Sequence, residues 1–241
     1  MKYLLLIYSA ESAWTDESRA ACMVESMGIG VELAKQNKFI TSAPLQYVAT
    51  AKTVKVVENE TVHTTGPFME TIEHLGGFYV LDLPHLDEAI QVACRLPPAK
   101  KGTVEIRPLQ VGSLDTNLST HGVDLVHVDQ PVYMLMQYGG QAVSTLDQHA
   151  VWALVTDCNL VLQLPLCPAS SATSAQVRSD GRRIADGACD EASEQLNHIV
   201  ILKAKDTSDV QTVAECLARQ FSGTWEIRPL FDLRPIAAQF L

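Results

Sequence analysis

Short, nearly continuous apolar runs alternate along the chain with segments whose apolar residues recur at helical spacing. Such runs are typical of buried strands, and a recurrence every three to four residues is typical of amphipathic helices. The predicted strands are Lys2–Tyr8, Thr53–Val57, Thr61–Thr64, Leu75–Leu83, Thr103–Pro108, Tyr133–Tyr138, Leu196–Ala204 and Thr224–Pro229. Three helices are predicted. The first begins after Thr15 or Asp16, and the other two cover Asp87–Leu96 and Asp209–Phe221.

These elements occur twice in the same order because the sequence itself is repeated. The segment Gly102–Leu109 returns as Gly223–Leu230 with seven of eight positions identical, at an offset of 223 − 102 = 121. With that offset, residues 44–109 align with 165–230 without a gap, and 19 of those 66 positions are identical. A repeat of this length indicates a duplicated domain, because a solenoid unit has a period of about 20–50 residues.

The duplication divides the chain into two similar units. We expect a first repeat over residues 1–110, a linker over 111–130, a diverged second repeat over 131–232 and a C-terminal tail over 233–241. Within the linker, Val123–Val128 is apolar enough to predict a short strand. Each repeat has the element order of a ferredoxin-like βαββαβ unit, whose sheet needs cover on its second face. The expected fold class is therefore α+β, with two tandem ferredoxin-like repeats packing sheet to sheet as an intrachain dimeric α/β-barrel.

Charge and apolar run length narrow the function classes. The formal net charge is −10, and no basic run is longer than two residues, so nucleic acid is not an expected partner. No apolar run approaches the length of a membrane span, so no membrane partner is expected either. The apolar start Tyr3–Tyr8 recurs in mid-chain at Tyr133–Tyr138, where no signal peptide acts. We therefore expect a cytoplasmic protein whose N-terminal run is a strand.

The cysteines and the motif search give no sign of a bound metal or cofactor. None of the six cysteines forms a C-x-x-C pair, and none falls at equivalent positions in the two repeats. This spacing favours free thiols in a reducing compartment over a zinc site or a disulfide framework. No cofactor-binding motif occurs, so neither a cofactor nor a metal is predicted.

Several short motifs, taken in order, resemble the YCII-related family in its DGPF (DGPFAETKE-type) branch. In the first repeat they follow the opening strand and are Thr50–Val54, Gly66–Glu73, Leu75–Phe78 and Thr103–Pro108. The first repeat has Thr65 in place of the Asp of the motif. The second repeat keeps Asp186 and Gly187 but has Ala188 and Cys189 in place of Pro and Phe. The resemblance implies the dimeric α/β-barrel superfamily, in which two ferredoxin-like units meet through their sheets.

The same resemblance implies general expectations about partners and chemistry. Related assemblies are homodimers, and some DGPF-type proteins are associated with extracytoplasmic-function sigma factors, so a homodimer and a transcription-linked protein partner are both compatible with it. Some relatives carry a His–Asp pair regarded as catalytic, with the His on the first helix and the Asp after the second helix near a proline. His149 matches the His place in the second repeat. The Asp place holds Leu96 in the first repeat and Leu217 in the second.

Candidate ligand residues come from the repeated Glu-Ile-Arg-Pro strand and from the ends of the first strands. Alternation along a strand puts the Glu and the Arg on one face. Arg107 and Arg228 are expected either to bind a small organic anion bidentately or to form structural ion pairs at the seam between the repeats. Tyr8 and Tyr138 end the first strands and either line a pocket or pack in the core.

Two glutamate pairs are a third candidate. Glu70 with Glu73, and Glu191 with Glu194, are spaced so that they would share one face of a helical turn. Two close carboxylates can divide acid and base roles between them, and the alternative is a solvated face or a helix cap.

Two functions remain open on the sequence, which does not decide whether the protein is an enzyme. The first is a small-molecule binding or accessory protein without catalysis. The second is a cofactor-independent lyase or isomerase acting on a small organic acid. In that case His149 would be the base, and Arg107 or Arg228 would hold the anion of the substrate.

Overall fold

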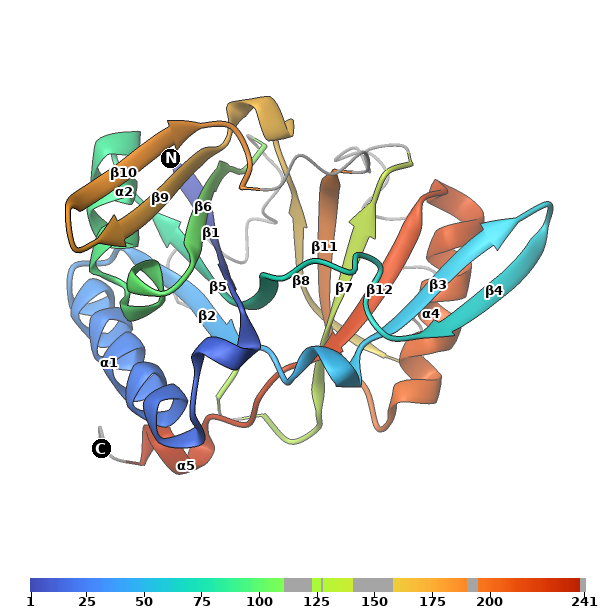
Figure 1. Ribbon diagram of the computed structural model, residues 1–241. Helices are drawn as coiled ribbons and strands as arrows, with labels where there is room; N and C mark the ends of the chain where they lie inside the picture. Colours follow the sequence, from blue (N-terminus) through green and yellow to red (C-terminus); the bar gives the residue numbers. More distant parts are fainter. Residues whose placement is uncertain (111–122, 127, 141–157, 190–194, 239–241) are drawn as a thin grey trace.

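Two antiparallel sheets of six strands each face one another, and the helices lie on their outer surfaces (Figure 1). This arrangement is seen in a computed structural model that describes residues 1–110, 123–126, 128–140, 158–189 and 195–238. Within these residues, no helix is both long enough and apolar enough to cross a bilayer.

The strands and helices carry the labels of Figure 1. The strands are β1 (Lys2–Ser9), β2 (Phe39–Pro44), β3 (Lys52–Val57), β4 (Glu60–Thr65), β5 (His74–Asp82), β6 (Thr103–Pro108), β7 (Val132–Tyr138), β8 (Asn159–Pro165), β9 (Thr173–Arg178), β10 (Gly181–Asp186), β11 (Leu196–Lys203) and β12 (Thr224–Pro229). The helices are α1 (Asp16–Lys35), α2 (Leu86–Arg95), α4 (Thr207–Phe221) and α5 (Arg234–Ala237). Every predicted strand outside the linker is present, and β2, β8, β9 and β10 are additional to the predicted ranges.

Four consecutive strands of each sheet come from one repeat. The first sheet has the order β10-β9-β6-β1-β5-β2, and the second has the order β4-β3-β12-β7-β11-β8. The segments β6-β1-β5-β2 and β12-β7-β11-β8 both have the strand order of a ferredoxin-like unit. The predicted fold class, two such units packed sheet to sheet, is therefore confirmed.

The outer hairpin of each sheet comes from the other repeat. Strand β9 pairs with β6, with Ala175 opposite Val104, and strand β3 pairs with β12, with Val54 opposite Trp225. In Figure 1 the cyan hairpin β3–β4 lies beside orange-red β12, and the orange hairpin β9–β10 lies beside green β6. Val54 and Ala175 are fully buried in the core of the opposite repeat. The two repeats are therefore interlocked by an exchange of hairpins.

Side-chain alternation along the strands builds three layers of core. Leu4 and Leu6 point between the sheets, where they join Met134 and Met136 in a shared core. The alternate residues of β1, such as Leu5, face α1 and α2 instead. A third core fills the space between the second sheet and α4.

The linker and the tail are fastened to the first repeat. The Val123 amide donates to the Ile40 carbonyl at 2.8 Å, and Thr41 Oγ1 donates to the Val123 carbonyl at 2.8 Å. Residues 123–126 nevertheless contain no strand, so the prediction of a strand over Val123–Val128 is wrong. A single backbone bond and a side chain tether the segment to β2 without a ladder. In the tail, Leu233 and Ile236 are buried, and α5 packs near α1.

Candidate functional site

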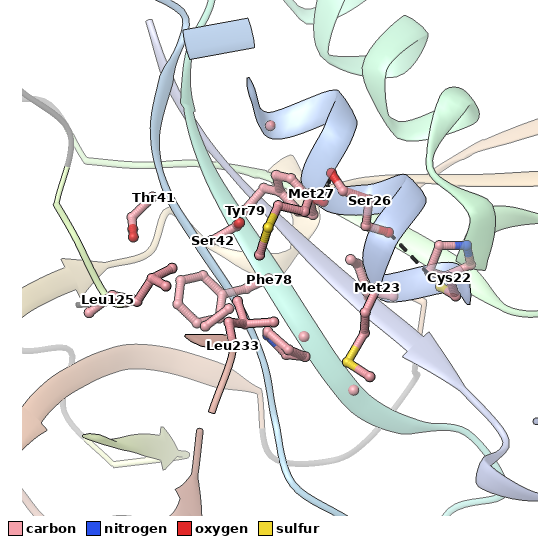
Figure 2. Close-up of a pocket in the computed structure, with 18 of the residues that line it drawn as sticks. Cys22, Met23, Ser26, Met27, Thr41, Ser42, Phe78, Tyr79, Leu125 and Leu233 are labelled. Atoms are coloured by element: carbon pink, nitrogen blue, oxygen red, sulfur yellow. Dashed lines mark hydrogen bonds between the residues drawn. The ribbon is translucent and has the colours of Figure 1, made fainter. Parts of the chain in front are cut away.

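A cavity of about 490 Å³ lies between α1 and the β2 edge of the first sheet. One face of α1 forms one wall, and β2 and β5 form another. The segment 123–126 and the α5 region contribute the remaining sides. Figure 2 shows Met23, Met27, Phe78, Leu125 and Leu233 gathered around this space. The volume lies in the range of about 300–1,000 Å³ that is typical of small-molecule sites.

Local sequence sets the position of α1 over this space. Thr15 and Ser18 form a capping box, in which the Ser18 amide donates to Thr15 Oγ1 at 3.2 Å and the Thr15 amide donates to Ser18 Oγ at 2.9 Å. Further along the helix, Gly30 faces β2. A Cβ at that position would lie 3.2 Å from the Phe39 ring, so glycine permits a close approach at this end of the cavity.

Several polar side chains line the cavity, and the protein supplies hydrogen-bond partners for some of them. The Tyr79 hydroxyl donates to the Ser26 carbonyl at 2.8 Å, and Trp14 Nε1 donates to Ser9 Oγ at 3.0 Å. Burial raises the pKa of the Tyr79 hydroxyl well above its ordinary value, and burial also raises the pKa of the Cys22 thiol. Both groups therefore stay protonated at neutral pH. The cavity wall offers binding contacts here and no ionised nucleophile at these two positions.

Arg107 is not part of the cavity lining, because its side chain is buried between the sheets. Its guanidinium forms an ion pair with Glu105, with Nε at 2.9 Å from Oε1, and its Nη1 donates to the carbonyls of Leu196 (3.0 Å) and Cys167 (3.3 Å). The second oxygen of Glu105 accepts from the Cys189 amide at 3.1 Å. The pair thus fixes the turn of the second repeat to the final strand of the first.

Arg228 forms the equivalent ion pair in the second repeat, and this pair contacts the first repeat. Its Nη1 lies 3.5 Å from Glu226 Oε1, and its Nη2 donates to the Gln46 carbonyl. Glu226 Oε2 accepts from the Phe68 amide at 3.0 Å. Burial raises the pKa of Glu226, and the contacts with Phe68 and Arg228 act against that rise. Of the two interpretations that the sequence left open for these arginines, the contacts are those of structural ion pairs.

The two turns held in this way owe their shape to glycine. Gly66 has φ +115° and Gly187 has φ +98°, which L side chains rarely adopt. The amides of these glycines donate to the carbonyls of Ala51 (2.9 Å) and Ala172 (2.8 Å). The two strongest sequence motifs, the glycine turn and the Glu-Ile-Arg-Pro strand, therefore meet across the repeats.

The other candidate residues lie apart from the cavity. Tyr138 is buried in the core between the sheets, with its ring centroid 5.2 Å from that of Phe68, and Tyr8 packs against the same core. Burial raises the pKa of both tyrosine hydroxyls well above the ordinary value. Glu70 is exposed. His149 and Glu191 lie outside the described residues, as does Glu194.

The segment that holds the first glutamate pair contains no helical turn. Residues 66–73 contain no helix, because the glycine turn and the contacts of the following residues hold the segment in irregular structure. Glu73 accepts a hydrogen bond from Thr103 Oγ1 at 3.1 Å, whereas Glu70 faces solvent. Across the described part of the chain, no group of three or more His, Cys, Asp and Glu side chains is placed to hold a metal ion.

Sequence reasoning missed the cavity, although a signal for its wall was present. Met23, Met27 and Val31 recur at helical spacing, which predicts a stripe that faces the core. The structure shows that this stripe lines the cavity instead. Periodicity identifies an apolar face but does not tell whether protein atoms fill the space against it.

The cavity also lies where the family resemblance puts a His–Asp pair. Its walls include the first helix and Pro98, which follows the end of the second helix by a few residues. In the first repeat α1 contains no histidine, and Leu96 and Pro97 occupy the place of the Asp. In this repeat, therefore, neither place carries the titratable side chain that such a pair would need.

His198, on β11, is a buried polar group away from this cavity. It is fully buried, neither ring nitrogen has a hydrogen-bond partner, and burial lowers its pKa to about 3. The folded protein therefore resists protonation that the unfolded chain accepts near its ordinary pKa of 6.5. The free energy of unfolding is therefore not reduced by His198 above the pKa of the unfolded state. It falls as the pH drops from there toward the pKa of the folded state. We expect a loss of about 2 kcal/mol in the free energy of unfolding at about pH 5 relative to about pH 7.

Urea unfolding of the wild type and of His198→Leu at the two pH values measures this contribution. The variant is expected to lose less stability on acidification, by about 2 kcal/mol. His63→Gln is the matched control, because His63 is exposed. Equal acid sensitivity of the wild type and His198→Leu would rule out this role for His198.

The comparisons with known proteins agree with the sequence motifs. The YCII-related domain family matches residues 1–111. An uncharacterised protein of Rhizobium meliloti (strain 1021) is 35% identical over 114 residues, which are 45% of this chain and 92% of that protein. Among solved structures, a mutant chlorite dismutase from Candidatus Nitrospira defluvii has 11% identity and a TM-score of 0.45. A heme-binding protein from Thermus thermophilus has 11% identity and a TM-score of 0.44.

Each of those two structures is matched over 99% of this chain and 94% of its own length, and neither likeness bears on function. The family match covers the first repeat, which carries most of the motifs quoted above. This chain belongs to the YCII-related family.

Proposed function

We propose that the protein binds a small, largely apolar molecule in the cavity between α1 and β2. The observation that carries this proposal is the cavity itself, about 490 Å³ with mostly apolar walls. Sites for small molecules combine mostly hydrophobic walls with a few polar groups, and this composition matches the cavity.

The chemistry of Tyr79, of Cys22 and of the places for a His–Asp pair supports binding over catalysis in the first repeat. The places for a His–Asp pair hold other residues, and burial keeps Tyr79 and Cys22 protonated. A general base must be within hydrogen-bond reach of its proton and must have a suitable pKa. The two groups named here do not meet the second condition at neutral pH.

Thermal unfolding in the presence of a metabolite library tests the proposal. A ligand at about 100 times its Kd stabilises the folded state by about 2.7 kcal/mol. For a chain of this length, that corresponds to a rise of about 5 °C or more in Tm. At least one largely apolar compound is expected to give such a rise.

The variant Met27→Trp locates the binding site. Met27 lines the cavity, so an indole at this position would occupy the space and is expected to abolish the ligand-induced rise in Tm. Val62→Trp is the control, because Val62 is exposed on β4 and does not line the cavity. A Met27→Trp variant that folds and still shows the full rise would place the ligand elsewhere and would refute the proposal.

A further inference from the structure

We propose that the ligand of this cavity is an amphipathic monoanion whose charged group binds Arg19 and whose apolar body extends along α1. This inference rests on the proposed function, since it specifies the ligand of the same cavity. It is carried by the position of Arg19, by its contacts, and by the distribution of charge between the two ends of the cavity.

Different residues line the two ends of the cavity. The start of α1 lies beside the end of β2, because the two elements run side by side in opposite directions. Its lining along α1 extends from Arg19 to Ala34, about 22 Å at 1.5 Å per residue. Arg19 lies at the end where β2 is followed by Leu45, since its Nη2 donates to the Leu45 carbonyl at 2.9 Å. Gly30, toward the other end, lies against Phe39. A ligand in this space therefore meets Arg19 at one end only.

Arg19 is positioned by the protein without being neutralised. Its guanidinium lies 3.9 Å from the centroid of the Tyr47 ring, and one of its donors is taken by Leu45. Within the described residues no carboxylate comes within ion-pair distance of it, although its half-buried guanidinium is always charged. Its remaining N–H groups are free to donate to an anionic group in the fork geometry that suits a carboxylate.

The acidic groups at this end are already engaged by donors of the protein. Glu11 Oε1 accepts from the Val48 amide at 2.6 Å, and Asp16 Oδ1 accepts from the Tyr47 hydroxyl at 3.1 Å. A second cation is also close. Lys101 Nζ lies 4.3 Å from the centroid of the ring of Trp14, a residue that lines the cavity. Lys101 does not line the cavity and also donates to the Ala13 carbonyl at 2.8 Å, so Arg19 is the cationic group at this end that a ligand can reach.

The rest of the cavity disfavours a second charge. Its middle is lined by Met23, Met27 and Phe78, which offer no partner to an ion. Asp124, which also lines the cavity, belongs to the segment that is hydrogen-bonded to Ile40 of β2. A carboxylate there repels a second anionic group, so the ligand class is a monoanion with an apolar body.

Isothermal calorimetry with three probes of one chain length tests this assignment: decanoate, decanol and decylammonium. The wild type is expected to bind decanoate about tenfold more tightly than decanol, and decylammonium most weakly. Arg19→Gln is expected to weaken decanoate binding about tenfold and to leave decanol binding within about twofold. Arg183→Gln is the matched control, because it removes the same charge from the exposed hairpin β9–β10.

A conservative variant distinguishes the loss of the positive charge from a loss of the folded structure. Arg19→Lys keeps the charge, so it is expected to retain a preference for decanoate over decanol. Equal binding of decanoate and decanol by the wild type overturns the inference, and so does an equal loss of both probes in Arg19→Gln. If decanol binds and Met27→Trp abolishes that binding, the proposed function stands while the inference fails. If none of the three probes binds, the inference fails, and the library screen decides the proposed function separately.

Discussion

Replacing Glu105 by alanine is expected to lower the free energy of unfolding by about 3–5 kcal/mol, because the change leaves a buried charge without its partner. The side chains of Arg107 and Glu105 are each only 2% exposed. In Glu105→Ala, Nε and Nη2 of Arg107 would lose their acceptor, and the Cys189 amide would lose its acceptor as well. The loss therefore affects the ion pair and the turn of the second repeat together.

A double-mutant cycle separates the contribution of the ion pair to the free energy of unfolding from the contribution of the other contacts of these two residues. Urea unfolding would be measured for Glu105→Ala, Arg107→Met and the two changes combined. The double variant is expected to lose less than the sum of the single variants, because neither partner is then left as an unpaired charge. Asp180→Asn is the control at an exposed pair with Arg183, where the expected loss is below about 1 kcal/mol.

The same cycle decides between the two roles that the sequence left open for Arg107. A structural ion pair predicts a large loss of stability. A loss below about 1 kcal/mol in Glu105→Ala would contradict the structural role and would return Arg107 to the set of candidate ligand residues.

The order of elements within each repeat was predictable, because it depends on local patterns. The run Lys2–Tyr8 and the helical spacing after Thr15 both correspond to observed elements, β1 and α1. Strand β2 was missed because Thr41, Ser42 and Pro44 interrupt its apolar pattern. Strand β8 has a clearer apolar run, but it lies in the part of the second repeat that aligns least well with the first.

The exchange of hairpins was not predictable from pattern alone. Val54 and Ala175 would be buried apolar residues whether each hairpin joined its own sheet or the other one. Alternation reports which face is buried and does not report which chain segment covers it. The glycine turns and the Glu-Ile-Arg-Pro strands were recognised as motifs for the same local reason, whereas their contact across the repeats depends on the tertiary fold.

The candidate site was predicted least well, because it depends on space that no side chain fills. Arg19 was not singled out in the sequence, since one arginine on a helix is usually a solvated residue. Its importance comes from neighbours that are distant in sequence, Leu45 and Tyr47, and from a cavity that periodicity does not detect.

Cutting the chain between the repeats is expected to leave the two halves bound to each other. Each sheet takes its outer two strands from the other half, and the core between the sheets contains residues of both. Separation would therefore expose sheet edges and apolar faces at the same time. Obligate interfaces of this kind are tight, so we expect an apparent Kd of about 1 nM or tighter.

A protease site inserted within residues 111–122 makes the measurement possible in the chain that contains both repeats. After cleavage, the two fragments are expected to elute together in gel filtration and to separate only at urea concentrations that unfold the protein. Val54→Asp places a carboxylate in the core of the second repeat, so its cleaved form is expected to separate at lower urea. Val57→Asp is the control on the same strand, because Val57 is exposed. Two separate native peaks from the cleaved wild type would contradict the exchange of hairpins as the main link between the repeats.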